Sequence, residues 1–311
     1  MRISVCISTV RPITLRTAIE SIRGQTWTDW ELIVVGQGHS ARLEAATREA
    51  AHDEPRVRYL HSPRRGLSIA RNAGVQTANG EIIAFTDDDC EARADWLSTL
   101  AQCFMDEPEI GLVGGSVVPP KPLRQRFAMC PSMIPDETLY DPVACRRQPP
   151  RGFEWLGANF AIRRSVAERV GPFDECLGSG AAFPAAEDTD YKLRLEALGV
   201  KMRATPRAVV FHTFGYRYGL RAVLRNSRNY AEGNAGLAGK LTLLGDPRGE
   251  EWRLATKRDC TRGWLRPPRP HRLPAGLWRL RHFLRAYERC LHEYQAIDGL
   301  LQPRRLERVS L

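Results

Sequence analysis

The sequence lacks the closely spaced cysteine pairs that zinc knuckles and thiol redox motifs use. Its eight cysteines are spread from Cys6 to Cys290, and no two of them stand two or three residues apart. Cys6 falls inside an apolar, strand-like run, so we expect its thiol to be buried. The spacing argues against a metal knuckle and a dithiol redox site, and it predicts reduced thiols in a reducing compartment.

Long apolar runs are also missing, and none approaches the roughly 20 residues that a membrane-spanning helix needs. The first residues, MRISVCISTV, enter a strand-like pattern without a charged-then-apolar leader or a small-residue cleavage site. With 311 residues, 43% of them hydrophobic, the chain can bury a core of ordinary size. We therefore expect a globular protein in the cytoplasm, with peripheral attachment at the inner face of the membrane as an open alternative.

The positive charge is confined to the last third of the chain. Residues 216–311 hold 20 Lys and Arg against 9 Asp and Glu, whereas the residues before them are almost neutral in sum. Residues 264–276, WLRPPRPHRLPAG, predict a proline-broken basic linker. Three- and four-residue spacing after it predicts a helix with one apolar stripe, formed by Leu277, Leu280, Leu284, Tyr287, Leu291 and Tyr294.

Three uses of this basic, mostly helical region stay open. It could pack its stripe onto the catalytic domain, attach to an anionic membrane surface, or form a homodimer through the stripe. Nucleic acid is not an expected partner, because no aromatic-basic platform or reader motif is visible.

Strand-like and helix-like segments alternate in the first 86 residues. Apolar runs predict strands at residues 2–8, 30–36, 57–62 and 81–86, and periodic apolar residues predict helices at residues 14–24, 41–52 and 66–80. This alternation predicts an α/β domain with a largely parallel sheet, in which ligands bind outside the carboxyl ends of the strands. The segments that follow three of these strands, at residues 9–12, 36–40 and 87–89, should therefore meet at one edge.

Beyond residue 110 the alternation becomes irregular. The pattern predicts a strand that runs into a proline-rich turn at residues 111–122, an irregular loop or lid at 130–152, a strand and a short helix at 153–175, a helix at 187–200 and a strand at 207–214.

Three consecutive acids, in the stretch FTDDDC, follow the strand at residues 81–86. Carboxylates packed this closely repel one another, which should raise at least one pKa unless a cation is present. One of them could cap the helix expected in ADWLSTL, but a cap needs only a single acid. Three acids at a strand end favour a hard divalent cation, held by carboxylate oxygens together with substrate phosphates.

A second acidic cluster opens the helix predicted at residues 187–200. Glu187, Asp188 and Asp190 would suit the positive end of that helix without any further role. The small residues before them, GSGAAFPAA, could instead bring the backbone close to a ligand. A carboxylate in that place could act as general base on an incoming hydroxyl group.

Four segments resemble glycosyltransferase family 2, whose members have the GT-A fold. They are SVCISTVRPITLRTAIESIRGQTWTDWELIVV, GLSIARNAGVQTANGEIIAFTDDD, GANFAIRRSVAERVGPFDE and EDTDYKLRLEALG, which occur in the family's order and together span about residues 3–215. The resemblance implies a Rossmann-type mixed, mostly parallel sheet flanked by helices, with a C-terminal helical extension. It implies a nucleotide-sugar-binding half at residues 1–110, an acceptor and catalytic-base half at 111–215, and an added region at 216–311.

The resemblance also assigns roles by position. The nucleotide-sugar would contact Thr9, Val10, Arg11, Gln37, Arg71, Asp87 and Asp88. Mn²⁺ or Mg²⁺ on the diphosphate would be bound by Asp89 and His212, the acceptor side would include Gly157, Ala158 and Asn159, and Asp188 would be the catalytic base with Glu187 beside it. Arg71 as a surface arginine and His212 as a structural histidine are the alternatives for those two residues.

These roles imply an inverting transfer of a sugar from a nucleoside diphosphate to a hydroxyl acceptor, which could be a saccharide, a lipid-linked molecule or a small natural product. A metal-dependent nucleotidyltransferase is a rival, but STVRPITLR after the first strand lacks the glycine-rich phosphate loop it would need. A carbohydrate-binding protein with a degenerate site is another. The family's acids after the second strand are replaced by Gly36 and Gln37, which leaves UDP in doubt because Gln37 can both donate and accept.

Overall fold

The computed structural model describes residues 1–38, 41–119, 132–213, 219–261 and 273–304. The chain forms two compact units. The first comprises Met1–Phe173 and Tyr191–Tyr218, and the second comprises Asp174–Asp190 and Gly219–Leu311. The division expected near residues 110 and 215 stays a prediction. Across the described ranges, no helix is both long and apolar enough to cross a membrane.

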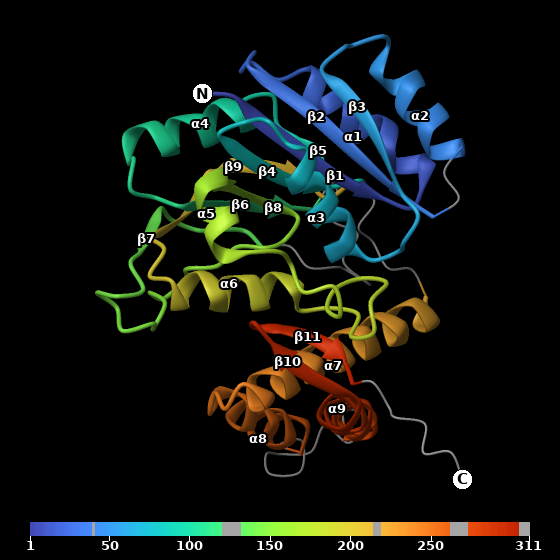
Figure 1. Ribbon diagram of the computed structural model, residues 1–311, viewed down its shortest axis with the longest axis vertical. Coiled ribbons are helices and arrows are strands. Elements are labelled where there is room, and N and C mark those ends of the chain that lie inside the picture. Colours follow the sequence, from blue (N-terminus) through green and yellow to red (C-terminus); the bar gives the residue numbers. More distant parts are fainter. Residues whose placement is uncertain (39–40, 120–131, 214–218, 262–272, 305–311) are drawn as a thin grey trace. The chain divides into compact units, whose positions relative to one another are not determined.

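The first unit opens with the predicted alternation of strands and helices (Figure 1). The elements are β1 (Ile3–Thr9), α1 (Pro12–Arg23), β2 (Trp30–Gln37), α2 (Ala41–Ala51), β3 (Val57–Ser62), α3 (Leu67–Thr77) and β4 (Ile82–Asp87). β1 pairs in parallel with β2 and β4, and β2 pairs in parallel with β3. The mostly apolar sequences of β1, β2 and β4 suit strands that helices cover on both faces.

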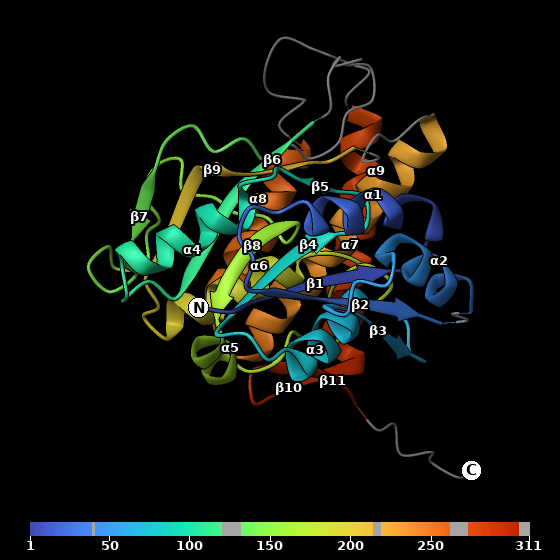
Figure 2. The same cartoon turned by 90° about the horizontal axis from the view of Figure 1, so that it is seen from above.

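The rest of this sheet is mixed. It adds β5 (Glu91–Ala92), α4 (Trp96–Asp106), β6 (Leu112–Val118), β7 (Thr138–Tyr140), β8 (Asn159–Arg163), α5 (Arg164–Val170), α6 (Glu187–Ala197) and β9 (Met202–Phe211). The strand order is β3-β2-β1-β4-β8-β6-β9-β5, with β7 on β9, and Figure 2 shows β1, β2 and β3 in that order towards one edge. β8 runs antiparallel to β4 and β6. The predicted mixed, mostly parallel α/β sheet is confirmed.

Two expectations for this half need correction. The strand expected at residues 207–214 begins earlier, at Met202, and ends at Phe211. The described part of the loop expected at 130–152 contains β7, because residues 138–140 pair with β9.

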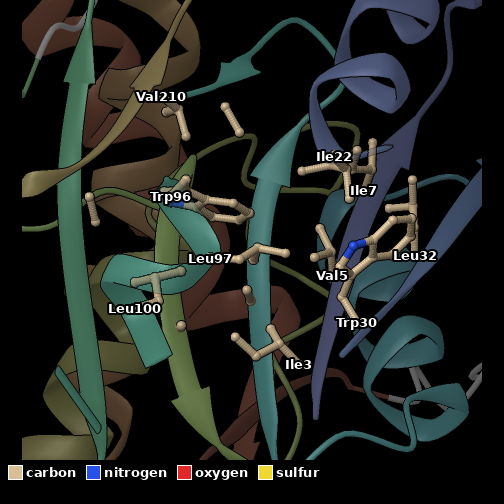
Figure 3. Close-up of a cluster of buried hydrophobic side chains, with 14 of the residues drawn as sticks. Ile3, Val5, Ile7, Ile22, Trp30, Leu32, Trp96, Leu97, Leu100 and Val210 are labelled. Atoms are coloured by element: carbon tan, nitrogen blue, oxygen red, sulfur yellow. The ribbon is translucent and has the colours of Figure 1, made fainter. Parts of the chain in front are cut away.

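Each face of the sheet has its own core. On one face, side chains of α1, α2 and α4 pack against the strands, and Figure 3 shows Trp30 of β2 and Trp96 and Leu97 of α4 among them. On the other face, α3, α5 and the later turns of α6 cover the strands. Burying a large apolar side chain contributes about 1.5–3 kcal/mol. These cores therefore fix the strand register that places the polar residues at the strand ends.

The second unit is helical. It contains α7 (Leu220–Leu243), α8 (Arg248–Thr261), α9 (Leu273–Glu293) and the hairpin of β10 (Tyr294–Ile297) and β11 (Leu300–Pro303). α9 packs against α7 and α8 through buried residues that include Leu280, Phe283, Tyr287 and Cys290. The predicted apolar stripe is thus correct at its centre and wrong at its ends, because Leu277 is 49% exposed and Tyr294 begins a strand. The helix already begins at Leu273, within the expected linker, whose residues 264–272 lie outside the described part.

Candidate active site

The parallel register brings the polar strand ends together. Ser8 of β1 lies opposite Asp87 at the end of β4, Thr9 lies opposite Gly36 of β2, and Gln37 lies opposite Ser62 of β3. On the other side of the acids, Glu91 of β5 pairs with Phe211 of β9. This short pairing places His212, the next residue after β9, beside the acids.

The acids do not cap the helix that follows them. That helix, α4, begins only at Trp96, with Asp95 in the N-cap position. Asp88 instead accepts a 2.6 Å hydrogen bond from the Thr9 hydroxyl and a 3.1 Å hydrogen bond from the Arg11 guanidinium. Burial raises the pKa of Asp88, although these two partners act in the opposite direction. Asp88 therefore connects the end of β4 to the segment after β1.

Asp89 lies between two nitrogen groups. His212 Nε2 is 3.1 Å from Asp89 Oδ1, and Arg11 donates to Asp89 Oδ2 at 3.1 Å. Burial alone would raise the pKa of Asp89, but the hydrogen bond with His212 and the charges of His212 and Arg11 hold it below its ordinary value. The carboxylate is consequently charged at neutral pH, although it is only 5% exposed.

Asp89 and His212 also belong to a group of side chains that could hold a metal ion. Ligand atoms of Asp89, Cys90 and His212 all lie within 4.8 Å of one another. Burial and the neighbouring Asp87 and Asp89 raise the pKa of the Cys90 thiol well above its usual value, and a protonated thiol is a poor ligand. The charged Asp89 carboxylate and the adjacent His212 imidazole remain as ligands, and together they fit a divalent cation.

Asp87 and Arg71 form the next part of the site. Arg71, on α3, is only 3% exposed, so the alternative of a surface arginine is wrong. Its Nη2 donates to the carbonyl oxygen of Gly157 at 2.8 Å and lies 3.9 Å from Asp87 Oδ1. Burial raises the pKa of Asp87 to about 6, with Asp89 adding to this rise and Arg71 opposing it.

Gly157 makes room for this arginine. A Cβ atom at residue 157 would lie 2.7 Å from Arg71 Nη2, which is closer than such contacts come in proteins. The neighbouring Ala158 is buried at 9% exposure. Gly157 therefore borders the Arg71 guanidinium, and Ala158 belongs to the hydrophobic core.

Asn159 is held inside the sheet. Its amide donates to the carbonyl oxygens of Ser116 and Ala208, and its carbonyl oxygen accepts from the Trp96 indole at 2.8 Å. With 0% exposure, Asn159 joins β6, β8, β9 and α4 and offers no surface to a ligand. Any effect of Asn159 on acceptor binding would therefore be indirect.

The turn after β2 has features that the sequence did not predict. Gln37 Oε1 accepts from the backbone N–H of Gly66 at 2.8 Å, which fixes the orientation of its amide. The side chain of Tyr59 fills the space that a Cβ at residue 36 would need, and Arg65 does the same at Gly38. Tyr59 thus lies against Gly36 and Arg65 against Gly38, and only the two glycines hinted at this. Val10, after β1, is 51% exposed.

The Arg-Asn pair of α3 has a second structural member. The Asn72 amide donates to the Phe173 carbonyl oxygen at 3.0 Å and accepts from the Phe173 N–H at 2.8 Å. The Phe173 ring in turn lies 5.5 Å from the Arg71 guanidinium. Asn72 therefore fixes the backbone of the residue beside the buried arginine.

Glu187 and Asp188 lie in the second unit, in the first turn of α6. Asp188 Oδ1 accepts from the backbone N–H of Thr189 at 2.7 Å. Glu187 is 8% exposed, whereas Asp188 is half-buried. The small residues before them pack against α7, since Ala185 lies directly against Gly233. The expectation that this approach runs close to a ligand stays a prediction.

The sequence model described as "Glycosyl transferase family 2" matches residues 4–171, which is more than half of the chain. The chain therefore belongs to glycosyltransferase family 2 and is a glycosyltransferase with a GT-A-like fold. This assignment favours sugar transfer over the nucleotidyltransferase and the non-catalytic alternatives.

Two curated glycosyltransferases are similar in sequence to this chain. A glucosyl-dolichyl phosphate glucuronosyltransferase of Haloferax volcanii is 28% identical over 231 residues, which cover 70% of this chain and 71% of the relative. A pre-mycofactocin glycosyltransferase of Mycobacterium tuberculosis is 29% identical over 213 residues, 64% of this chain but only 39% of the relative.

Solved structures support the same fold. The mannosyltransferase PcManGT of Pyrobaculum calidifontis, in complex with GDP-Man and Mn²⁺, gives a TM-score of 0.60 at 17% identity and covers 94% of this chain and 87% of that one. Residues 1–349 of TarS from S. aureus also give 0.60, at 14% identity, with 99% and 98% coverage. At these identities the likeness extends to the fold alone.

Proposed function

We propose that this glycosyltransferase moves a sugar from a nucleoside diphosphate to a hydroxyl acceptor with inversion at the anomeric carbon. One observation carries the proposal: the ends of β1, β4 and β9, together with α3, gather a charged carboxylate, an imidazole and two arginines at Asp87–Asp89. Such a cluster suits a ligand that combines a divalent cation with a diphosphate, because the cation pairs with the acids and the phosphates with the arginines.

Asp89 and His212 are the residues that would hold Mn²⁺ or Mg²⁺. The ion supplies charge stabilisation for the departing diphosphate when it is bound. Asp88 would act through Thr9 and Arg11, which it holds in place, rather than as a ligand. The GDP-Man and Mn²⁺ named for the Pyrobaculum enzyme support this assignment by analogy.

The remaining residues have distinct parts in the transfer. Arg71, fixed by the Gly157 carbonyl, would stabilise negative charge on the leaving nucleoside diphosphate. Asp188 would take the proton of the acceptor hydroxyl while its oxygen attacks the anomeric carbon from the side opposite the diphosphate. The bond to the diphosphate breaks with its electron pair, so a single displacement inverts the configuration. Gln37, Tyr59 and Arg65 would border the nucleobase.

A saccharide on a lipid carrier is the acceptor class that we propose to examine first. The Haloferax relative acts on a dolichyl phosphate according to its name, and a Campylobacter jejuni relative, 33% identical over 104 residues, is named for an undecaprenol-linked substrate. The first turns of α7 support contact with an anionic membrane. They expose Leu220, Val223, Leu224 and Tyr230, together with Arg221, Arg225 and Arg228. Apolar and basic side chains on separate sides of one helix suit an interfacial position.

The proposed activity is tested by measuring nucleoside diphosphate release from a panel of GDP-, UDP- and dTDP-sugars, with Mn²⁺, Mg²⁺ or chelator. We expect metal-dependent release from one donor, faster when the acceptor is present. Pyrophosphate release from a nucleoside triphosphate would instead favour a nucleotidyltransferase. Thermal stabilisation by free sugar without any turnover would favour a binding protein.

A further inference from the structure

The second unit contains a buried cluster of charged side chains that connects α7 to the first turn of α6. Lys240 of α7 is 1% exposed, and its Nζ lies 2.8 Å from Asp174 Oδ2 and 2.5 Å from Asp190 Oδ1. Asp174 Oδ2 also accepts from the backbone N–H of Leu301 in β11 at 2.8 Å. A buried lysine is costly unless it is paired in this way. Lys240 therefore joins three separate segments at one point.

The same helix is shaped to receive the segment before α6. A Cβ at residue 233 would lie 2.5 Å from Ala185 Cβ and 2.6 Å from Ala185 N, and a Cβ at residue 236 would lie 2.6 Å from Phe183 Cβ. Glycine at these two positions of α7 thus allows the backbone of residues 183–185 to lie directly on the helix. Glycine within a helix costs roughly 0.5–1 kcal/mol relative to alanine, so its presence here needs a packing reason.

Further contacts hold the segment before α6 at Ala182 and Phe183. Arg289 of α9 donates to the carbonyl oxygen of Ala182 at 2.7 Å, and its guanidinium lies 4.8 Å from the Phe183 ring. Ala186, the last residue before α6, has a φ of 71°, in the left-handed region that alanine rarely adopts. Contacts on both sides of Ala186 are needed to hold it there.

The cluster also sets the direction of the acid that we assign as base. Successive helical residues are about 100° apart, so residues two apart point to nearly opposite sides of a helix. Because Lys240 draws Asp190 into the buried cluster, Asp188 is turned away from it. This agrees with the burial of Asp190 at 2% exposure and the partial exposure of Asp188.

We propose that α7 is a positioning platform for the catalytic base, with Lys240, Gly233 and Gly236 as positioning residues. The inference rests on the proposed function, because it takes Asp188 as the base. It gives the C-terminal helical unit a role in the chemistry: the unit holds the first turn of α6 at the orientation that proton transfer needs. A displacement of about 1 Å at such a group can cost about 100-fold in rate.

The test compares two ways of loosening the platform. The double variant D190N/K240M removes one negative and one positive charge, so the net charge of the cluster is kept while its connection to α6 is lost. The variant G233A leaves all charges in place and pushes against Ala185. The control is N234A, at the exposed neighbouring position of the same helix. Melting temperature, affinity for the nucleoside diphosphate with Mn²⁺, and kcat and KM for the acceptor are measured for each.

We expect kcat to fall about 100-fold in D190N/K240M and in G233A, with nucleotide affinity unchanged and N234A like the wild type. If both variants fold and keep the wild-type kcat, or lose nucleotide affinity in proportion to kcat, the inference is overturned. Should D190N/K240M fail to fold, G233A decides alone. D188N separates the two proposals: an active D188N refutes Asp188 as the base, whereas an inactive D188N beside fully active platform variants refutes only the platform.

Discussion

Arg11 pairs with the carboxylate that we propose as the metal ligand, and this gives a sharp prediction for its removal. The guanidinium donates to Asp88 and to Asp89, each at 3.1 Å, and its side chain is 51% exposed. Burial lowers the pKa of Arg11, but the two carboxylates outweigh that effect and raise it. With Asp89 as the proposed ligand, Arg11 and a metal ion would compete for the same negative charge.

The size of the effect follows from the exposure of Arg11. An ion pair with one exposed partner contributes roughly 0.2–1 kcal/mol after solvent screening, and Arg11 makes two. One of these two pairs is with Asp89, so replacing Arg11 with glutamine should release Asp89 from about 0.2–1 kcal/mol of competition. Since about 1.4 kcal/mol corresponds to a factor of ten, Mn²⁺ alone should bind up to about fivefold more tightly to Arg11→Gln.

The assay is a titration of Mn²⁺ into protein without nucleotide, followed by electron paramagnetic resonance. Sugar transfer should fall in the same variant, because the arginine no longer faces the diphosphate. Arg16→Gln is the matched control, since Arg16 lies on α1, directly after Arg11, and pairs with Glu20 instead of with the site. Unchanged or weaker Mn²⁺ binding in Arg11→Gln would refute competition and with it Asp89 as a ligand.

Three further predictions concern other parts of the molecule. Asp188→Asn should lower kcat by about 10²–10⁴-fold while nucleotide affinity measured by calorimetry stays unchanged, and retained turnover would contradict its role as base. Asn159→Ala leaves three buried hydrogen-bonding groups without their partner, so it should destabilise the fold by about 3 kcal/mol in chemical denaturation, and a loss of acceptor affinity at full stability would contradict the structural role. Leu224→Asp should reduce sedimentation with phosphatidylglycerol vesicles relative to Glu250→Gln, and equal sedimentation of the two variants would count against membrane contact through α7.

The first 86 residues could be predicted closely because local signals agree with the fold there. β1, β2 and β4 are mostly apolar runs, each helix has an apolar stripe, and Gly24 ends α1 as expected. The contact of Asp88 and Asp89 with the segment after β1 followed from the rule for strand ends. The short pairing of β5 with β9, which brings His212 to Asp89, depends on two residues and leaves no periodic signal.

Side-chain partners could not be predicted, because they depend on contacts between distant segments. Asn159 resembled an acceptor-side residue by its place in GAN, but the sheet turns its amide inward towards Trp96. Lys240 is 66 residues from Asp174 and 50 residues from Asp190 in the sequence. In the sequence, Lys240 is one of 20 Lys and Arg in residues 216–311, and no local pattern distinguishes it from the others.

The central claim is that Asp89 couples a divalent cation to the diphosphate of the donor. The most direct measurement is calorimetry of nucleoside diphosphate binding to the wild type and to Asp89→Ala, with Mn²⁺ and with chelator. The account predicts that chelator weakens binding to the wild type and that Asp89→Ala binds equally weakly in both conditions and supports no transfer. Metal-dependent binding of wild-type strength in Asp89→Ala would contradict the claim.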